Sequence, residues 1–243
     1  MQITTRQLRA LARDVDEQHH EGMRNFRHET AELHLDAVRA SRRNFLTGSA
    51  GIVGAAMLVT TGVLPGMRPR FVHAAGLDDQ TIAGYAQSVE LAAVEAYKAA
   101  APALSAAVLP VAQLFLSHHQ QHADAFGSVA GDKAAKGPNA KLIAAVTPTL
   151  KGIKDEKGAL EFAFILEGQA AYTYAAALTL LQNPAFAAAT ATILPIEAQH
   201  QTVLGLALGK SVSDVFPTGA FEAAALGDGT NPLAGLDPAV FAG

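Results

Sequence analysis

The stretch ILPIEAQHQTVLGLALG at positions 193–209 decides the fold, because it sets one Glu and one His in an otherwise uncharged, apolar run. Three residues along a helix amount to about one turn, so Glu197 and His200 project from the same face. Glu197 is the single formally charged residue between Gly168 and Gly209. A buried, unpaired carboxylate costs several kcal/mol, and no arginine follows Arg70 in the chain. The partner of Glu197 must therefore be a lysine, a histidine, a shared proton or a metal ion.

Three further stretches after Gly76 have the apolar spacing and the boundaries of long helices. Asp78 or Asp79 suits the N-cap of the first stretch, and Pro102 follows its end. The connection over 131–154 contains a possible short helix, KLIAAVTPTL, and is long enough to run the length of a bundle. This pattern predicts an all-α four-helix bundle with one long crossover. We expect its helices over about 79–101, 105–130, 155–182 and 183–209.

The other three helices also carry metal-binding side chains on faces that should point inward. Glu90 and Tyr97 are seven residues apart, so they stack on one face, and Glu167 lies among apolar and aromatic neighbours. His122 shares its face with the two histidines that precede it. All four histidines that follow Gly76 lie at such positions, which histidines scattered over a surface would not do. We predict a metal site in the bundle core formed by Glu90, His119, His122, Glu167, Glu197 and His200, with His118 as the alternative to His119.

The composition excludes several classes of function. The chain has 243 residues, with 18 Lys and Arg against 22 Asp and Glu, and a net charge of −4. A nucleic-acid-binding protein is expected to present a basic face, so we expect no nucleic-acid partner. The chain has no cysteine, which excludes disulfides, thiolate zinc sites, iron–sulfur clusters and a cysteine nucleophile. Oxygen and imidazole are the remaining strong metal ligands.

Three segments carry a resemblance to a known family: VELAAVEAY (89–97), HHQQHADAF (118–126) and ILPIEAQHQTVLGLALG (193–209). Together with Glu167, they resemble the ferritin-like superfamily over about residues 78–209. More narrowly, they are similar to exported bacterial ferritin-like proteins related to plant desiccation-related proteins. The resemblance implies a ferritin-like four-helix bundle with a dinuclear metal site, usually iron. In this family type, two helices each supply one Glu and the other two each supply a Glu-x-x-His.

The sequence departs from that family pattern at one position. His119 stands where the second helix would supply a Glu, so one of the two bridging carboxylates is missing. Less anionic charge is then present to hold two Fe(III) ions. Imidazole serves several transition metals, so we expect iron, one ion or two, and leave manganese, zinc and copper open.

Residues 41–75 resemble a twin-arginine export signal. They begin SRRNFL, with Arg42 and Arg43 paired, and continue into an uncharged stretch rich in Gly and Ala. Small residues near Ala74 and Ala75 suit a signal peptidase. A retained membrane helix is the alternative, although Gly and Pro in or beside the stretch make it a poor one. We expect export across the cytoplasmic membrane by the twin-arginine translocase, with membrane contact through this segment alone.

The two ends of the chain are expected to lie outside the bundle, which we place at 76–210. Residues 1–40 form a charged N-terminal extension with helical spacing, read as a solvated amphipathic helix whose histidines are not ligands. Those histidines are His19, His20, His28 and His34. Residues 211–243 are rich in Gly, Pro and Asp with no sustained period, so we expect an extended tail.

Two functions fit these features. The first is a metal centre that oxidises Fe(II) or consumes oxygen or peroxide, in which Tyr97 and Tyr174 lie beside the ligands. The second is a non-enzymatic stress or envelope protein that keeps a structural metal or none and binds a partner through its tail. Iron storage would need a closed multi-subunit shell, and the sequence leaves assembly into a homo-oligomer open.

Overall fold

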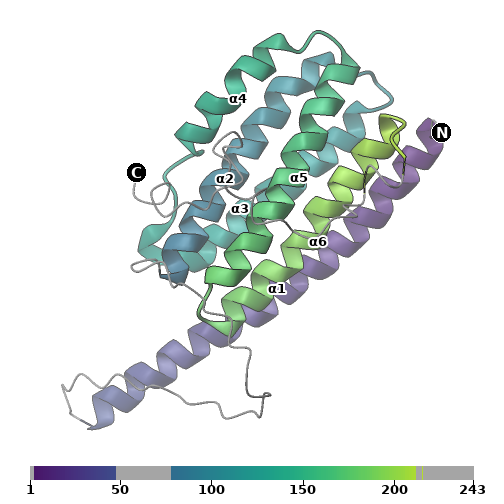
Figure 1. Ribbon diagram of the computed structural model, residues 1–243. Helices are drawn as coiled ribbons and strands as arrows, with labels where there is room; N and C mark the ends of the chain where they lie inside the picture. The colour runs from purple at the N-terminus through teal and green to yellow at the C-terminus, as the bar shows by residue number, and fades with distance from the viewer. Residues whose placement is uncertain (1–2, 48–77, 212–214, 216–243) are drawn as a thin grey trace, which may run out of the picture.

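The computed structural model describes residues 3–47, 78–211 and 215, and at 32–47, 176 and 179 it describes the backbone alone. These residues form six α-helices and two short 3₁₀ turns, with no strand among them. Figure 1 shows the helices side by side in an elongated bundle. They are α1 (Thr5–Thr47), α2 (Asp79–Ala100), α3 (Leu109–Ala130), α4 (Ala140–Gly152), α5 (Glu156–Leu180) and α6 (Pro184–Ala207).

The four long helices expected after Gly76 are confirmed as α2, α3, α5 and α6. Their first turns are capped as the sequence predicts: the Asp78 side chain accepts a hydrogen bond from the Thr81 amide, and Asp155 accepts one from Gly158. Asn183 caps α6 ahead of Pro184, which occupies the first turn and needs no amide partner. Gly131 ends α3 with a φ of 57°, a left-handed value that favours glycine.

The helices pack as two hairpins, α2 with α3 and α5 with α6. The crossover between the hairpins contains α4, the short helix expected around 141–150. This helix lies on the outside of the bundle and packs against α2 and α5 (Figure 1). Two helix hairpins joined by one long connection are the connectivity of a four-helix bundle with one crossover.

The N-terminal helix differs from our expectation. We predicted a solvated helix over residues 1–40, but one face of α1 packs along α6 and α3. Its buried positions alternate in steps of four and three residues, the spacing of a helix seam, while the charged residues occupy the other faces. Mixed charge on those faces therefore does not mean that the whole helix is solvated. The buried side chains are Leu8, Ala12, Val15, His19, Met23, Phe26 and Thr30.

Two apolar clusters fill the bundle and leave a polar layer between them. One cluster contains Val15 of α1 and Phe115 of α3, and the other contains Phe26 and Phe126 of the same two helices. The Phe26 and Phe126 rings meet edge to face, with centroids 5.6 Å apart. The middle of the bundle, between these clusters, is where the histidines and glutamates gather.

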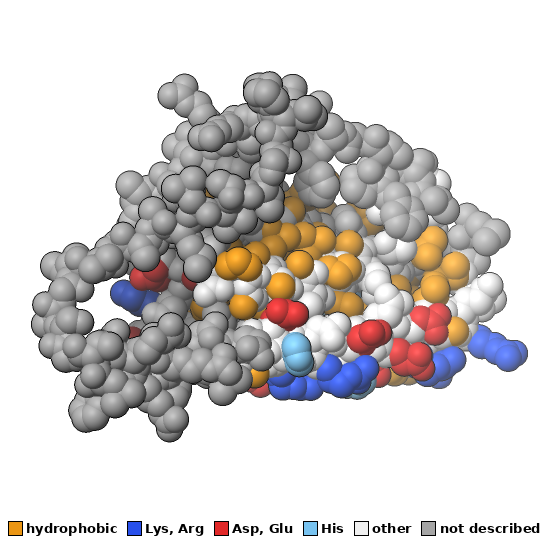
Figure 2. All heavy atoms as spheres, turned by 90° about the horizontal axis from the view of Figure 1, so that it is seen from below, with side chains coloured by type: hydrophobic (Ala, Val, Ile, Leu, Met, Phe, Trp, Pro, Cys, Tyr) orange, Lys and Arg blue, Asp and Glu red, His pale blue; other side chains and the backbone are white. Residues whose placement is uncertain are grey.

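The predicted export signal is largely outside the described residues. Ser41 to Thr47 continue α1 as helix, and 48–75 are not described. The predicted tail, residues 211–243, also lies outside the described residues, apart from Ser211 and Val215. Within the described part of the chain, no helix combines the length and apolar character needed to cross a membrane. Figure 2 shows one face of the molecule, on which acidic and basic side chains lie interspersed along a border beside an apolar area.

We predict that Phe26→Ala lowers the free energy of unfolding by about 3–5 kcal/mol, the cost of emptying a buried aromatic site. Phe26 is 1% exposed. Urea unfolding followed by circular dichroism measures the change. Asn25→Ala, at the exposed neighbouring position, is the matched control and should change stability little. Equal stability of the two variants would contradict the packing of α1 against the bundle.

Candidate metal centre

All six residues predicted as ligands meet in the polar layer at mid-bundle. The six side chains come from four helices: Glu90 from α2, the two histidines from α3, Glu167 from α5, and the Glu-x-x-His pair from α6. Each is at most 2% exposed. They form two groups of four whose ligand atoms lie within 4.8 Å of one another. The groups are Glu90, His119, His122 and Glu197, and His119, Glu167, Glu197 and His200.

The first group surrounds the carboxylates of Glu90 and Glu197. His122 Nδ1 lies 2.8 Å from Glu197 Oε1 and 3.5 Å from Glu90 Oε1. His119 Nδ1 lies 2.7 Å from Glu90 Oε2. His122 and His119 are one helical turn apart on α3, so both rings reach the same two carboxylates.

The second group surrounds Glu167. His119 Nε2 lies 3.0 Å from Glu167 Oε1, and His200 Nδ1 lies 3.3 Å from Glu167 Oε2. His200 Nδ1 also lies 3.4 Å from Glu197 Oε2, as expected for two residues three apart on α6. His119 and Glu197 belong to both groups. The two ring nitrogens of His119 face different carboxylates, so this ring can serve both groups.

Two buried tyrosines donate hydrogen bonds to two of these carboxylates. Tyr97 of α2 donates a hydrogen bond to Glu167, and Tyr174 of α5 donates one to Glu90. Burial, followed by the adjacent carboxylates, raises the pKa of both phenols well above the usual range. Each tyrosine therefore stays protonated and acts as a fixed donor.

The sequence left His118 as the alternative to His119, and the structure places His118 outside both groups of four. His118 Nδ1 lies 2.9 Å from His200 Nε2, and His118 Nε2 lies 3.0 Å from Asp16 Oδ1 of α1. A second partner of this kind fixes which nitrogen of a ligating histidine faces the metal. His118 thus orients His200 toward Glu167 and Glu197, and Phe115 stacks on the His200 ring from the apolar side at 4.0 Å.

The cluster balances its charges internally. Burial alone would raise the pKa of Glu90, but His122 and His119 lower it to about 2. Burial would likewise lower the pKa of His122, but Glu90 and Glu197 raise it to about 9. The same opposition raises the pKa of His119 and of His200 and lowers that of Glu167. Without metal at neutral pH, His119 and His122 therefore carry protons that offset the charge of the carboxylates.

Sequence reasoning missed two residues of α1 beside this layer. His19, expected to be solvated, is 0% exposed, and its ring stacks on His118 with centroids 3.8 Å apart. Burial, then repulsion from His122 and His200, lowers the pKa of His19 to about 3, so its ring is neutral. Asp16 contacts His118. Two steps of four residues, from Val15 to His19 and from His19 to Met23, place His19 on the buried stripe, which is the signal that could have identified it.

The remaining histidines of α1 fit the expectation of solvated side chains where they are described. His20 and His28 are exposed. The side chain of His34 lies outside the described residues. His19 is therefore the α1 histidine that joins the mid-bundle layer in the described part of the chain.

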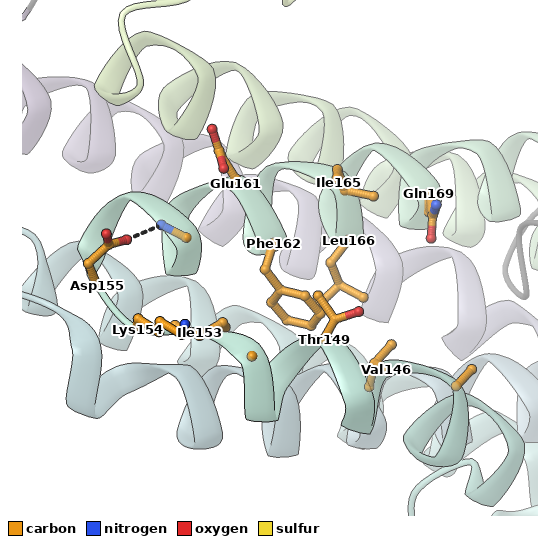
Figure 3. A pocket seen from close by; sticks show the side chains of 13 residues that line it. Val146, Thr149, Ile153, Lys154, Asp155, Glu161, Phe162, Ile165, Leu166 and Gln169 are labelled. Atoms are coloured by element: carbon orange, nitrogen blue, oxygen red, sulfur yellow. Dashed lines mark hydrogen bonds between the residues drawn. The ribbon is translucent and has the colours of Figure 1, made fainter.

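A separate hollow of about 820 Å³ lies between α4 and α5. Figure 3 shows Phe162 and Leu166 of α5 beside Val146 and Thr149 of α4, with Asp155 capping α5 at one end. None of the residues that line it belongs to the histidine and glutamate groups. The hollow is therefore distinct from the candidate metal centre.

Comparison with known proteins agrees with this geometry. A family model described as a ferritin-like domain matches residues 4–210, which include α1 as well as the two hairpins. No curated protein and no solved structure matches the chain. The match covers most of the chain, and the buried glutamates and histidines lie where a bundle-core metal site forms. The chain belongs to the family of ferritin-like domains.

Proposed function

We propose that this protein is an exported ferritin-like metalloprotein whose core site holds two metal ions, iron first among them, and oxidises Fe(II) or consumes oxygen or peroxide. The observation that carries the proposal is the pair of four-residue groups that share His119 and Glu197. Two overlapping ligand sets of carboxylate and imidazole suit two transition-metal ions better than one.

The residues present fit such ions. Both carboxylate oxygens of Glu197 and both ring nitrogens of His122 are buried and make no hydrogen bond of good geometry, although His122 Nδ1 lies 2.8 Å from Glu197 Oε1. A buried polar atom left without a partner costs about 1–3 kcal/mol. Metal coordination would satisfy the Glu197 oxygens and His122 Nδ1, the ring nitrogen that faces them, which supports Glu197 and His122 as ligands.

The surrounding residues give the site three properties that this chemistry needs. Tyr97 and Tyr174 fix the orientation of Glu167 and Glu90 by donating to them. Phe115, at 0% exposure, shields the site on one side and limits contact with water. His118 and Asp16 hold the ring of His200 in place.

Bound iron would supply one-electron chemistry toward Fe(II), oxygen or peroxide. The protein would supply the proton balance, because each histidine must release its proton before its ring nitrogen can bind a metal. His119, His122 and His200 are the residues that give up these protons. Glu90 and Glu167 remain ionised in both states.

Export by the twin-arginine route is the second part of the proposal. It rests on Arg42 and Arg43 and the uncharged stretch that follows them. Proteins that use this route cross the membrane folded, which suits a core site loaded with metal beforehand. Cleavage near Ala75 would cut the chain between α1 and α2, and the buried stripe of α1 would then be held by packing alone.

We predict that the full chain, loaded with Fe(II), retains about two metal equivalents after desalting, and that Glu197→Gln retains fewer than half as many. The amide keeps the side-chain shape but removes the charge that both groups share. Elemental analysis measures the difference, and circular dichroism confirms that the variant is folded.

Glu95→Gln is the matched control, because Glu95 is a glutamate on α2 of the same bundle whose side chain is 50% exposed and pairs with Lys98. It should retain as much metal as the unmodified chain. Equal metal content in Glu197→Gln and the unmodified chain, or no retained metal in either, would exclude the core site and favour a non-enzymatic bundle.

A second prediction concerns pH. Because the pKa of folded His122 is raised to about 9, its contribution to the stability of the metal-free protein is complete below its ordinary value and is lost as pH rises through about 9. The contribution of Glu90 is present above its ordinary value and is lost as pH falls through about 2. The melting temperature of the metal-free protein should therefore fall between about pH 7 and about pH 9.5.

The metal-loaded protein should not show this alkaline loss, because its histidines are already deprotonated. Metal binding at neutral pH should also release protons, which a dye in weak buffer detects. Identical alkaline melting profiles with and without metal, together with no proton release, would contradict the assignment of these histidines as ligands.

The export proposal is tested by Arg42→Lys with Arg43→Lys. The double variant keeps the charge but removes the arginine pair, so we expect the protein to remain in the cytoplasm. Cell fractionation and immunoblotting measure the distribution. The control is Arg68→Lys with Arg70→Lys, and export of both double variants alike would contradict the twin-arginine route.

A further inference from the structure

A third group of metal-binding side chains lies on α1, apart from the six core ligands. Asp16, His19 and His20 each offer one ligand atom, and these atoms lie within 4.8 Å of one another. The three residues stand at positions i, i+3 and i+4 of one helix, so they share a face. His20 Nε2 lies 3.5 Å from Asp16 Oδ1.

The buried member of this group is an imidazole without a partner. His19 is 0% exposed, and neither of its ring nitrogens has a hydrogen bond. Leaving such a group unsatisfied costs stability, and a histidine kept in this environment needs a ligand for at least one nitrogen. The neighbouring histidine and carboxylate supply the rest of a coordination set.

The other two members face outward. His20 has a side-chain exposure of 56% and Asp16 of 33%, while His118, which contacts Asp16, is fully buried. Side chains that can bind a cation therefore follow one another from the surface to the core. The series begins at His20, passes Asp16 and His19, and reaches His118 and then His200. The mid-bundle layer is connected to the surface on the α1 side by groups that can bind a cation.

We propose that Asp16, His19 and His20 form a third, labile site for a divalent transition-metal ion, on the path by which metal reaches the bundle core. Two histidines and one carboxylate make a set with open coordination positions, which suits Fe(II), Co(II) or Zn(II). With three protein ligands and two of them solvent-accessible, the site binds more weakly than the core and exchanges its metal. Its role in loading rests on the proposed function, but its existence as a binding site does not.

The test uses the full chain, stripped of metal and titrated with Co(II) alone. Equilibrium dialysis counts all bound ions, and desalting followed by elemental analysis counts those held tightly. The variant is His20→Ala, chosen because its exposed position leaves the packing of α1 intact, whereas replacing the buried His19 could unfold the helix. His28→Ala, an exposed histidine two turns further along α1, is the matched control.

We expect the unmodified chain and His28→Ala to bind one weak Co(II) beyond the tightly held ions, and His20→Ala to bind that ion about tenfold more weakly or not at all. Asp16→Asn, which removes the charge and keeps the shape, should weaken binding of the same ion; because Asp16 also contacts His118, this variant tests the weak site alone. Rapid mixing with Co(II) measures how fast the tight sites load, and loading should be severalfold slower in His20→Ala than in the unmodified chain, with the same final content. Equal weak binding in His20→Ala and His28→Ala would overturn the third site, and equal loading rates would overturn its role in loading.

Glu197→Gln separates this proposal from that of the core site. A variant that has lost its tightly held metal but still shows weak, His20-dependent binding supports the third site by itself. A chain that holds no tight metal in any form, yet loses weak binding on His20→Ala, would exclude the proposed function and leave the α1 site standing.

Discussion

Three carboxylates lie at the centre of a helix bundle with histidines as their charged neighbours. Glu90, Glu167 and Glu197 are each at most 2% exposed, and within the described part of the chain their ion pairs are all with His119, His122 or His200. Buried carboxylates of this number are tolerated only if positive charge is buried with them. Every other feature of the polar layer follows from that requirement.

Histidine can place positive charge beside a buried carboxylate in two ways, whereas lysine can do so in one. A protonated ring neutralises a carboxylate as lysine does, and a neutral ring can instead share that carboxylate with a metal ion. The same side chains can therefore stabilise the bundle before metal arrives and bind the metal afterwards. Tyr97 and Tyr174 support both states, since their hydroxyl groups donate to oxygens that remain negatively charged in each.

Much of the fold and of the core site could be predicted from the sequence, because both depend on local periodicity. Glu197 and His200 are three residues apart in an uncharged run, which fixes their common face once the run is helical. The order of the four helices after Gly76 and the short helix in the crossover followed from caps and prolines. His119 and His122 could be assigned to the core by the same reasoning.

Features that depend on contacts between distant segments could not be predicted in this way. The role of α1 was hidden because charges surround its apolar stripe, and packing against α6 and α3 shows that this stripe is buried rather than solvated. His118 and His119 are adjacent and both buried, so periodicity alone could not separate the residue that joins the two four-residue groups from the one that contacts His200. Asp16 reaches His118 across 102 positions of the chain, a distance at which sequence spacing carries no information.

The pairing of the first helix with the last one has a consequence for how the protein is made. Gln199 of α6 donates a hydrogen bond to Gln18 of α1 across 181 positions, so this contact can form only after α6 has been synthesised. The hairpin of α2 and α3 can close early, but its histidines then lack Glu167, Glu197 and the cover of α1. A nascent chain on the ribosome thus has no finished core site, and the full set of buried glutamates and histidines comes together only after α6 has folded against the other helices.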